Sequence, residues 1–558
     1  MRKFYKWAKF GMLISITTAV ALPTMAQSPA AVASADAYAS KVAQEVLLKG
    51  GNAVDAAVAT AFTLAVTYPE AGNIGGGGFM LIYFKGEPYF LDYREVAPIA
   101  ATANMYLDDS GEVIENMSLV GIKAAGVPGT VLGLWEAHQK FGVLPWEDLV
   151  SPAIAYAEHG FVVGNQLSLY GDAARESFAG KTNFEQHFSG LQSGLIFKQP
   201  ELAQTLQRIA KNGADEFYRG HTAELLIEQM QRDGGIITKE DLDAYEVKWR
   251  TPINFTWRGK EVLTAPPPSS GGIALAQLLM MQEQHINKIK NYSLNSVPHI
   301  HFMAELEKRV YADRAEYLGD PDFYQVPVEK LIDESYIQKR AGEVNFDKIS
   351  ETEEIKPGLE NHQTTHFSIL DFEGNAVSNT YTLNYDFGNG VVVEGAGFLL
   401  NNEMDDFSAK PGVMNIYGVV GGDANAIAPQ KRMLSSMTPT IVVDNGEVAL
   451  VVGTPGGSRI ITSVFQVLSN VFVFEMPLDK AVNAQRVHHQ LLPKDTIFYD
   501  AYAPIDDQQA KGLAAMGYQL EDQGWNMGDI QAILSRNGQV HAVSDARGRG
   551  KSLVIIRE

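Results

Sequence analysis

The pattern of the sequence changes at residue 364, and this change constrains the fold more than any other feature. Residues 127–341 show mainly the periodicity of helices joined by loops, whereas the residues after Thr364 are rich in strand signals. Between these parts, residues 351–360 are acidic, contain Pro357-Gly358 and lack apolar periodicity, which is typical of an exposed linker. Neither part alone has the helices and strands that a layered domain needs. We therefore expect strands from both parts to share sheets in one folded unit.

Local signals place some individual elements. Residues 34–67 are alanine-rich and are interrupted by a Gly-Gly-Asn step, which predicts two closely packed helices with Asn52 capping the second. Residues 440–443 and 447–452 are joined by Asp-Asn-Gly, a strong signal for a β-hairpin. Residues 465–474 indicate a helix.

A second predicted hairpin follows the linker and brings two threonines together. Residues 364–371 alternate between polar and apolar side chains, and a turn composition separates them from a returning strand at residues 376–383. A turn centred on Glu373 places Thr382 opposite Thr364. A turn centred half a residue later pairs Thr364 with Leu383, which is adjacent to Thr382.

The position of Thr364 at the start of this strand suggests a nucleophile. A threonine hydroxyl attacks well only when a base lies beside it, and the closest base possible is a free α-amino group on the same residue. Such an amine titrates near a pH of about 7.7–8.0, so it can accept the hydroxyl proton at neutral pH. This chemistry requires a chain cut before Thr364, so that the sequence is a precursor. The alternative is an ordinary strand that begins with two threonines.

The first 26 residues have the pattern of a secretory signal peptide. Four basic residues among the first nine precede an apolar run at residues 10–22, and a small-residue exit ends at Ala26. The run is too short for a membrane anchor. We therefore expect cleavage after Ala26, no membrane anchor in the mature chain, and a periplasmic or secreted protein; an anchored N-terminus is the alternative. The chain has no cysteine, so its stability depends on its core and not on disulfides.

The charge of the chain excludes some partners. The formal net charge is −21, and removing the four basic residues of the signal makes it −25, because residues 1–26 contain no acidic residue. Such an acidic surface disfavours nucleic acids and anionic membranes.

An ordered set of motifs covers the chain after the signal peptide. Before the linker, these motifs are residues 49–57 (KGGNAVDAA), 75–78 (GGGG), 92–98 (DYREVAP) and 267–272 (PPSSGG). From the linker onward, they are residues 363–366 (QTTH), 402–407 (NEMDDF), 434–437 (LSSM) and 454–459 (TPGGSR). In this order they resemble the motifs of γ-glutamyltranspeptidases, which belong to the N-terminal nucleophile hydrolase superfamily.

The resemblance implies a fold and a maturation step. The superfamily's fold is of the α/β (α+β) class, a four-layer αββα sandwich. The Thr364 hydroxyl would attack the Gln363 carbonyl, forming an ester that water opens. The products would be a large subunit of residues 27–363 and a small subunit of residues 364–558, which remain one intertwined unit. The freed Thr364 would be the catalytic nucleophile, with Thr382 as a hydrogen-bonding partner.

The resemblance also implies a pocket for a γ-glutamyl donor. The N–H groups of Gly456 and Gly457 would form the oxyanion hole. Arg94 would grip the donor's α-carboxylate, and the other predicted contacts are Ser435 and Ser436 for the carboxylate, Asp406 and Glu403 for the ammonium, and Asn384 through its amide. Residues 407–418, which contain Tyr417, resemble a lid loop. Taken singly, Arg94 beside Glu95 is compatible with a surface ion pair, and Asp405-Asp406 with a solvated turn.

The expected activity is that of a γ-glutamyltransferase, or glutathione hydrolase. It would cleave glutathione and related γ-glutamyl amides and pass the γ-glutamyl group to an amino acid, a dipeptide or water. One alternative is a glutaryl or cephalosporin acylase of the same fold, but a glutaryl group lacks the ammonium that Asp406 would bind. The other is an exported ligand-binding protein that never matures.

No cofactor and no metal are expected. His488-His489 lacks an HExxH context, and the segment ending in Gly550-Lys551-Ser552 lacks the first glycine of a phosphate loop. The segment Ser544-Asp545-Ala546-Arg547 departs from the family's usual aspartate-proline-arginine ending, which leaves the packing of that edge open.

Overall fold

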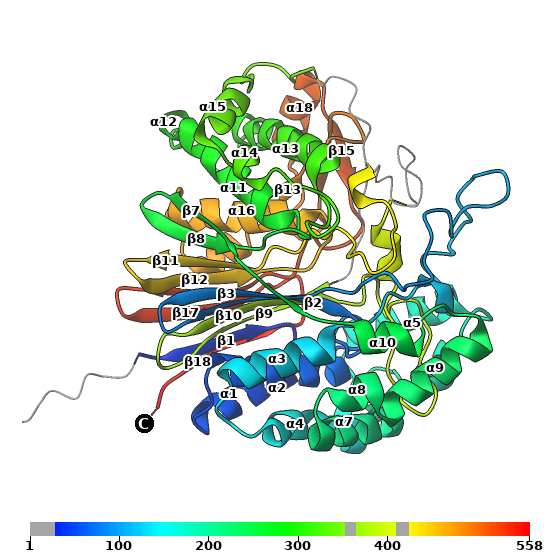
Figure 1. The fold of residues 1–558 in the computed structure, drawn as a ribbon. Coiled ribbons are helices and arrows are strands. Elements are labelled where there is room, and N and C mark those ends of the chain that lie inside the picture. The colour runs from blue at the N-terminus through cyan, green and yellow to red at the C-terminus, as the bar shows by residue number, and fades with distance from the viewer. Residues whose placement is uncertain (1–27, 352–363, 409–422, 558) are drawn as a thin grey trace, which may run out of the picture.

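The computed structural model describes residues 28–351, 364–408 and 423–557. Two sheets lie face to face at the centre of the molecule, and helices cover the outer face of each sheet (Figure 1). One apolar cluster fills the space between the seven-stranded sheet and its helices, and a second extends from the space between the sheets to the helices on the other side. The architecture is therefore a four-layer αββα sandwich, and the predicted fold class is confirmed.

The seven-stranded sheet mixes strands from both sides of residue 364. Its order is β18-β1-β9-β10-β2-β3-β6, and all neighbouring strands are antiparallel. The strands are β1 (Ala30–Ser34), β2 (Gly77–Phe84), β3 (Glu87–Tyr93), β6 (Lys248–Arg250), β9 (Thr364–Leu370), β10 (Ala376–Thr382) and β18 (Lys551–Ile555). The central pair β9–β10 is thus flanked by β1 and β2 from the beginning of the chain.

The six-stranded sheet is mixed in the same way, in the order β17-β16-β12-β11-β8-β7. Its strands are β7 (Ile253–Trp257), β8 (Lys260–Thr264), β11 (Thr440–Asp444), β12 (Glu447–Gly453), β16 (Gln531–Arg536) and β17 (Gln539–Ser544). The pair β11–β12 confirms the hairpin predicted around Asp-Asn-Gly. The mainly helical interpretation of residues 127–341 omitted β7, which alternates in burial, and β8, which pairs with β11; together they form an edge of this sheet.

Two small sheets lie outside the sandwich. One contains β13 (Val487–His488), β14 (Thr496–Tyr499) and β15 (Gln519–Asp522), and the other contains β4 (Phe161–Val162) and β5 (Ile196–Phe197).

The helices divide between the two outer layers. The layer that packs on the seven-stranded sheet contains α1 (Ala37–Leu48), α2 (Ala53–Thr67), α3 (Thr130–Phe141), α4 (Trp146–His159), α5 (Asn165–Phe178), α6 (Phe184–Phe188), α7 (Pro200–Asn212), α8 (Asp215–Arg219), α9 (His221–Asp233) and α10 (Lys239–Ala244). Helices α1, α2, α3, α4, α7 and α8 of this layer lie below the sheet in Figure 1. The other layer contains α11 (Gly271–Gln284), α12 (Ile286–Ile289), α13 (Val297–Tyr317), α14 (Val328–Leu331), α15 (Glu334–Gly342), α16 (Arg459–Phe472), α17 (Leu478–Val482) and α18 (Asp507–Met516). Asn52 caps α2 as predicted, because its side chain accepts hydrogen bonds from Val54 N and Asp55 N. Helix α16 begins six residues before the predicted start, at Arg459.

Polar side chains separate the two sheets at the end where β9 begins. His366 contacts Thr380 Oγ1 through Nδ1 at 2.8 Å and Ser368 Oγ through Nε2 at 3.1 Å. Burial lowers the pKa of His366 to about 3, so its ring is neutral. The ring lies against Gly453 at the end of β12, where an added Cβ would come within 2.3 Å of it. This contact sets how closely β9 and β12 approach at the point where Thr364 lies.

Candidate active site

Thr364 and Thr382 face each other at one end of the β9–β10 pair. The register pairs their Cα atoms directly, which confirms the turn centred on Glu373 and excludes the half-residue alternative. Thr364 Oγ1 donates to Thr382 Oγ1 at 3.5 Å, and the backbone N–H of Asn384 donates to the same Thr382 oxygen at 2.7 Å. The two hydroxyls are buried. Thr382 is thereby fixed by the strand end and by Asn384, and it can orient the hydroxyl of Thr364.

A glycine loop joins β12 to α16 beside these threonines. Gly456 has φ +129° and Gly457 has φ +57°, conformations that residues with a Cβ rarely adopt. Arg459 N then donates to Gly456 O and Ile460 N to Gly457 O, which starts the helix. Backbone N–H groups at a helix N-terminus attract negative charge. The loop therefore has the local structure that an oxyanion hole requires.

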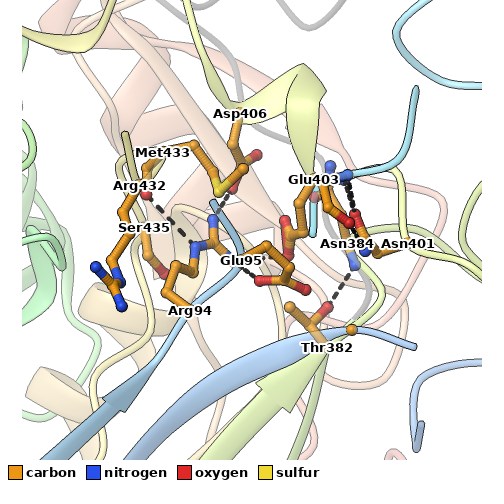
Figure 2. A network of polar contacts seen from close by, with 12 residues as sticks. Arg94, Glu95, Thr382, Asn384, Asn401, Glu403, Asp406, Arg432, Met433 and Ser435 are labelled. Carbon is orange, nitrogen blue, oxygen red and sulfur yellow. Dashed lines mark hydrogen bonds and ion pairs between the residues drawn. The ribbon is translucent and has the colours of Figure 1, made fainter. Parts of the chain in front are cut away.

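Arg94 forms the centre of a buried ionic cluster (Figure 2). It follows β3 directly, and only 1% of its side chain is exposed. Its guanidinium donates to Glu403 Oε1 at 2.6 Å and to the carboxylate of Asp406, and a Glu95 oxygen lies 3.8 Å away. Glu403 and Asp406 both belong to the short helix η2 (Glu403–Asp406). Arg94 is thus not the surface ion pair that its neighbour Glu95 alone would suggest.

Three carboxyl groups surround one guanidinium in this cluster, and a single positive charge does not keep all three ionised. Burial raises the pKa of Glu95 to about 8 and the pKa of Glu403 well above its usual range, although Arg94 opposes both shifts. Both oxygens of Glu95 and Oε2 of Glu403 have no hydrogen-bond partner among the described residues. The cluster is therefore a place where one more positive charge would be stabilised.

Ser435 and Ser436 are held by the motif at residues 267–272. Ser435 N donates to Pro268 O at 2.9 Å, and Ser270 N donates to Ser435 O at 2.7 Å. Arg314 bridges the two segments, donating to Ser270 Oγ at 3.0 Å and to Ser436 Oγ at 3.2 Å. The role of this motif was not apparent from the sequence; in the structure it supports the serine pair.

One pocket, with about 220 Å³ of empty space, brings most of the predicted residues together. Its lining contains Arg94, Thr364, Thr382, Asn384, Glu403, Asp406, Ser435, Ser436 and Gly457 from the predicted set, and in addition Met437 and Ile460. Gly456 precedes the lining residue Gly457 but is not itself part of the lining. Gln363 and Tyr417 lie outside the described residues, as does most of the predicted lid at residues 407–418.

Asparagines support the pocket without lining it. Asn401 Oδ1 accepts from Glu403 N at 3.0 Å, and Asn402 O accepts from Asn384 Nδ2 at 3.0 Å. Asn73 Nδ2 donates to the carbonyl oxygen of Thr382 at 2.9 Å. Sequence reasoning missed Asn73 and Asn401. Each lies next to a motif, at residues 75–78 and 402–407, and that adjacency was the only signal.

Two other sequence features have structural explanations. In the Ser544–Arg547 segment, Arg547 Nε pairs with Asp500 at 2.6 Å and Asp545 pairs with Arg486 at 2.5 Å, so this edge is held by buried ion pairs. His488 is buried and contacts Thr462 and Gln490. Among the described residues, none of the helices has the length and apolarity needed to cross a membrane.

Comparison with known proteins gives relatives along nearly the whole chain. The family described as "Gamma-glutamyltranspeptidase" matches residues 39–555. The chain is 66% identical over 525 residues to a glutathione hydrolase proenzyme of Pseudomonas aeruginosa, covering 94% of each chain.

Two of the similar solved structures are informative. A γ-glutamyltranspeptidase from Pseudomonas nitroreducens, complexed with L-DON, is 60% identical with a TM-score of 0.57, and the match covers 61% of this chain and 98% of that chain. A cephalosporin acylase from Bacillus halodurans is 25% identical with a TM-score of 0.82, covering 97% of this chain and 99% of that chain.

Proposed function

The chain belongs to the γ-glutamyltranspeptidase family and is an autoprocessed γ-glutamyltransferase, and on that premise we propose which of its residues perform each step. It is made as a precursor that yields two subunits, and its substrates are small molecules such as glutathione. The proposal assigns the cut to the Gln363-Thr364 bond. Residues 27–363 are 337 of the 558 residues, about three fifths, and the Pseudomonas nitroreducens chain covers a similar 61% of this chain, which supports that division.

Maturation uses the same hydroxyl as catalysis. Thr364 Oγ attacks the Gln363 carbonyl, the peptide nitrogen leaves as the α-amine of Thr364, and water hydrolyses the resulting ester. The contact between the Thr364 and Thr382 hydroxyls supports this assignment, because it orients the attacking oxygen. The reaction frees an amine next to the hydroxyl, so maturation creates the base that turnover needs.

Donor binding exchanges one ion pair for another. The γ-glutamyl group brings a carboxylate and an ammonium, and the pocket contains Arg94 already bound to Glu403 and Asp406. The donor carboxylate takes N–H groups of Arg94, with the hydroxyls of Ser435 and Ser436 nearby, while the donor ammonium takes the carboxylates of Asp406 and Glu403. Because the zwitterion replaces both partners, no buried charge is left unpaired.

Turnover then proceeds through an ester on Thr364. The α-amine accepts the hydroxyl proton as Oγ attacks the γ-carbonyl, and the N–H groups of Gly456 and Gly457 stabilise the oxyanion. The amine gives its proton to the departing nitrogen. An amino acid, a dipeptide or water next attacks the ester and gives up a proton to the amine. The amine returns this proton to Thr364 Oγ as the γ-glutamyl product leaves, which restores the free hydroxyl and amine.

One observation carries this proposal. Thr364, Thr382, Arg94 and Asp406 come from separate parts of the sequence, and they line one small pocket. The test is electrophoresis of purified protein with N-terminal sequencing of the smaller band. Wild type should give two bands, with the smaller one starting at Thr364, whereas Thr364→Ala should give one band and no turnover.

Thr365→Ala is the matched control. Thr365 pairs with Tyr381 on the same two strands, but its side chain points to the opposite face of β9 from Thr364. This variant should still be cleaved and should still turn over substrate. Activity in an uncleaved Thr364→Ala chain would overturn the proposal.

A glutaryl or cephalosporin acylase is the second candidate, favoured by the overall similarity to the Bacillus halodurans acylase. The carboxylate of Asp406, which is 11% exposed beside Arg94, argues against it, since a glutaryl group has no ammonium to neutralise that carboxylate. Rates on γ-glutamyl and glutaryl anilides separate the two, and faster glutaryl turnover would favour the acylase. Export to the periplasm or medium is proposed from the signal pattern of residues 1–26, and N-terminal sequencing of the larger band would test it by locating the cut at Ala26.

A further inference from the structure

The glycine motif at residues 75–78 has no part in the proposed chemistry, yet it lies between the two sides of the pocket. An added Cβ at Gly76 would come within 2.0 Å of Thr382 O, and one at Gly75 within 2.1 Å of Leu399 O. Glycine is therefore required because two backbone segments approach each other at this point. A buried asparagine lies on each side of the motif.

Asn73 is the asparagine on the nucleophile side. Its side chain is 4% exposed and makes four hydrogen bonds. Nδ2 donates to Thr382 O at 2.9 Å and to Ala71 O at 2.9 Å, and Oδ1 accepts from Gly76 N at 2.9 Å and from Thr130 Oγ1 at 2.7 Å. An amide has two donors and two acceptor positions, so every one is used. Asn73 thus ties the end of β10 to the glycine motif and to the start of α3.

Asn401 is the asparagine on the donor-binding side, and it is fully buried. Oδ1 accepts from Glu403 N at 3.0 Å and from Gly126 N at 2.9 Å, while Nδ2 donates to Gly75 O and Gly126 O, each at 2.9 Å. Its amide is used as completely as that of Asn73. Among these partners only Glu403 lines the pocket.

We propose that Asn73 is a positioning residue for the nucleophile and that Asn401 is its counterpart for the donor site. Asn73 fixes the carbonyl of Thr382, and the Thr382 hydroxyl in turn orients Thr364. Asn401 fixes the backbone of Glu403, whose carboxylate receives the donor ammonium. This inference rests on the roles proposed above for Thr364 and Glu403.

The two asparagines should affect different kinetic constants. A misplaced Thr382 weakens the attack by Thr364 without touching the donor contacts, so kcat should fall. A misplaced Glu403 weakens donor binding in the ground state and in the transition state alike, so KM should rise. A merely structural role would change neither constant selectively.

The experiment compares Asn73→Ser with Asn401→Ser, using a γ-glutamyl anilide and normalising activity to the amount of cleaved protein. Asn73→Ser should lower kcat by about 10-fold at nearly unchanged KM. This is the effect expected when one hydrogen bond that positions a reacting group is lost. Asn401→Ser should raise KM by about 10-fold at nearly unchanged kcat. Asn375→Ser is the matched control, because Asn375 is buried at the opposite end of β10, and it should lower the Tm without changing either constant.

Thr130→Val provides a milder variant, since it removes only the hydroxyl that donates to Asn73 Oδ1. Thr130→Val should also lower kcat at nearly unchanged KM. If Asn73→Ser does not fold, Thr130→Val tests the proposal in its place. Equal effects of Asn73→Ser and Asn401→Ser on the same constant, or a lower Tm with both constants unchanged, would overturn the inference. Those results leave the proposed function standing, because its own tests are the activity of Thr364→Ala and the comparison of γ-glutamyl with glutaryl anilides.

Discussion

Arg94 brings together the charges on which the proposed donor recognition depends. Its guanidinium contacts Glu403 and Asp406, and Glu95 lies close by. Asp406 is the member of this group whose side chain reaches the surface, with 11% exposure against 1% or less for the other three. On the proposed binding mode, we therefore expect the donor to meet Asp406 first and its ammonium to open the pair with Arg94.

We predict that Asp406→Asn raises KM for γ-glutamyl donors by roughly 10–100-fold, because a charge-assisted hydrogen bond to the ammonium is lost. Glutaryl anilide has no ammonium, so its turnover should change much less. Steady-state kinetics on both anilides measures the difference. Asp405→Asn is the control: Asp405 neighbours Asp406 but accepts from Ser118 Oγ and does not line the pocket, so its donor KM should stay within about 3-fold of wild type. Parallel losses on the two anilides would contradict the assignment.

A second residue-scale prediction concerns Glu95 and pH. Burial raises the pKa of Glu95 from its usual value of 4.5 to about 8, so the folded protein keeps this proton where the unfolded chain has lost it. The contribution of protonated Glu95 to the free energy of unfolding is therefore complete below pH 4.5, and it is lost as pH rises toward 8. A glutamine has no proton to lose, so Glu95→Gln should not lose stability in this way. We therefore expect the Tm of Glu95→Gln minus the Tm of wild type to increase from pH 5 to pH 8. Thermal unfolding across that range measures it. A Tm difference independent of pH would show that the proton is not held in the folded state.

The sequence identified the residues of the pocket better than it identified their neighbours. Thr364, Arg94 and Asp406 were identified because each belongs to a sequence motif, and a motif records both the residue type and its position along the chain. The ion pair of Arg94 with Glu403 joins residues 309 positions apart, which no local pattern encodes. Asn73, next to a glycine run, has the composition of any turn, and only the folded chain brings Thr382 against it.

Among the elements, strands β9 and β12 approach each other where the pocket begins. His366 on β9 packs its ring against Gly453 on β12, directly before the glycine loop. Gly453→Ala would place a Cβ 2.3 Å from that ring. We expect a cost of about 1–3 kcal/mol in the free energy of unfolding, as for other overpacked cores, together with a lower kcat because the loop with Gly456 and Gly457 moves away from Thr364.

Gly164→Ala is the control for this substitution, because a Cβ there meets no atom within 4 Å. Its unfolding free energy and its kcat should stay near the wild-type values. Denaturant titration and steady-state kinetics measure the two effects. A stable Gly453→Ala with normal kcat would mean that this contact does not set the position of the loop.

The elements that the sequence placed correctly are those with a complete local signal. The hairpins β9–β10 and β11–β12 have both a turn composition and alternating strands, and the cap of α2 has its asparagine. Helix α16 was predicted to start too late, because its first residues include Ile460, Ile461 and Val464, which favour strands locally. Complete burial of the helix overrides that preference. The strands β7 and β8 are short, and the pairing of β8 with β11 across the chain and of β7 with β8 decides their structure.

At the scale of the whole molecule, both sheets are built from strands on either side of residue 364. In the seven-stranded sheet, β9 pairs with β1. Its neighbour β10 pairs with β2 over seven residue pairs. In the six-stranded sheet, β11 pairs with β8. Separating the two subunits after cleavage would therefore open both sheets and expose both apolar cores.

We predict that the cleaved subunits separate only when the molecule unfolds. In a denaturant titration, the loss of helical circular dichroism and the separation of subunits on a sizing column should occur at the same midpoint. The uncleaved Thr364→Ala chain contains the same contacts but unfolds as one molecule, whereas the cleaved pair unfolds into two. The midpoint of the cleaved protein should therefore rise with protein concentration, while that of the uncleaved chain stays constant. Subunits that separate below the unfolding midpoint would refute the prediction, because each piece would then keep its structure without the strands of the other.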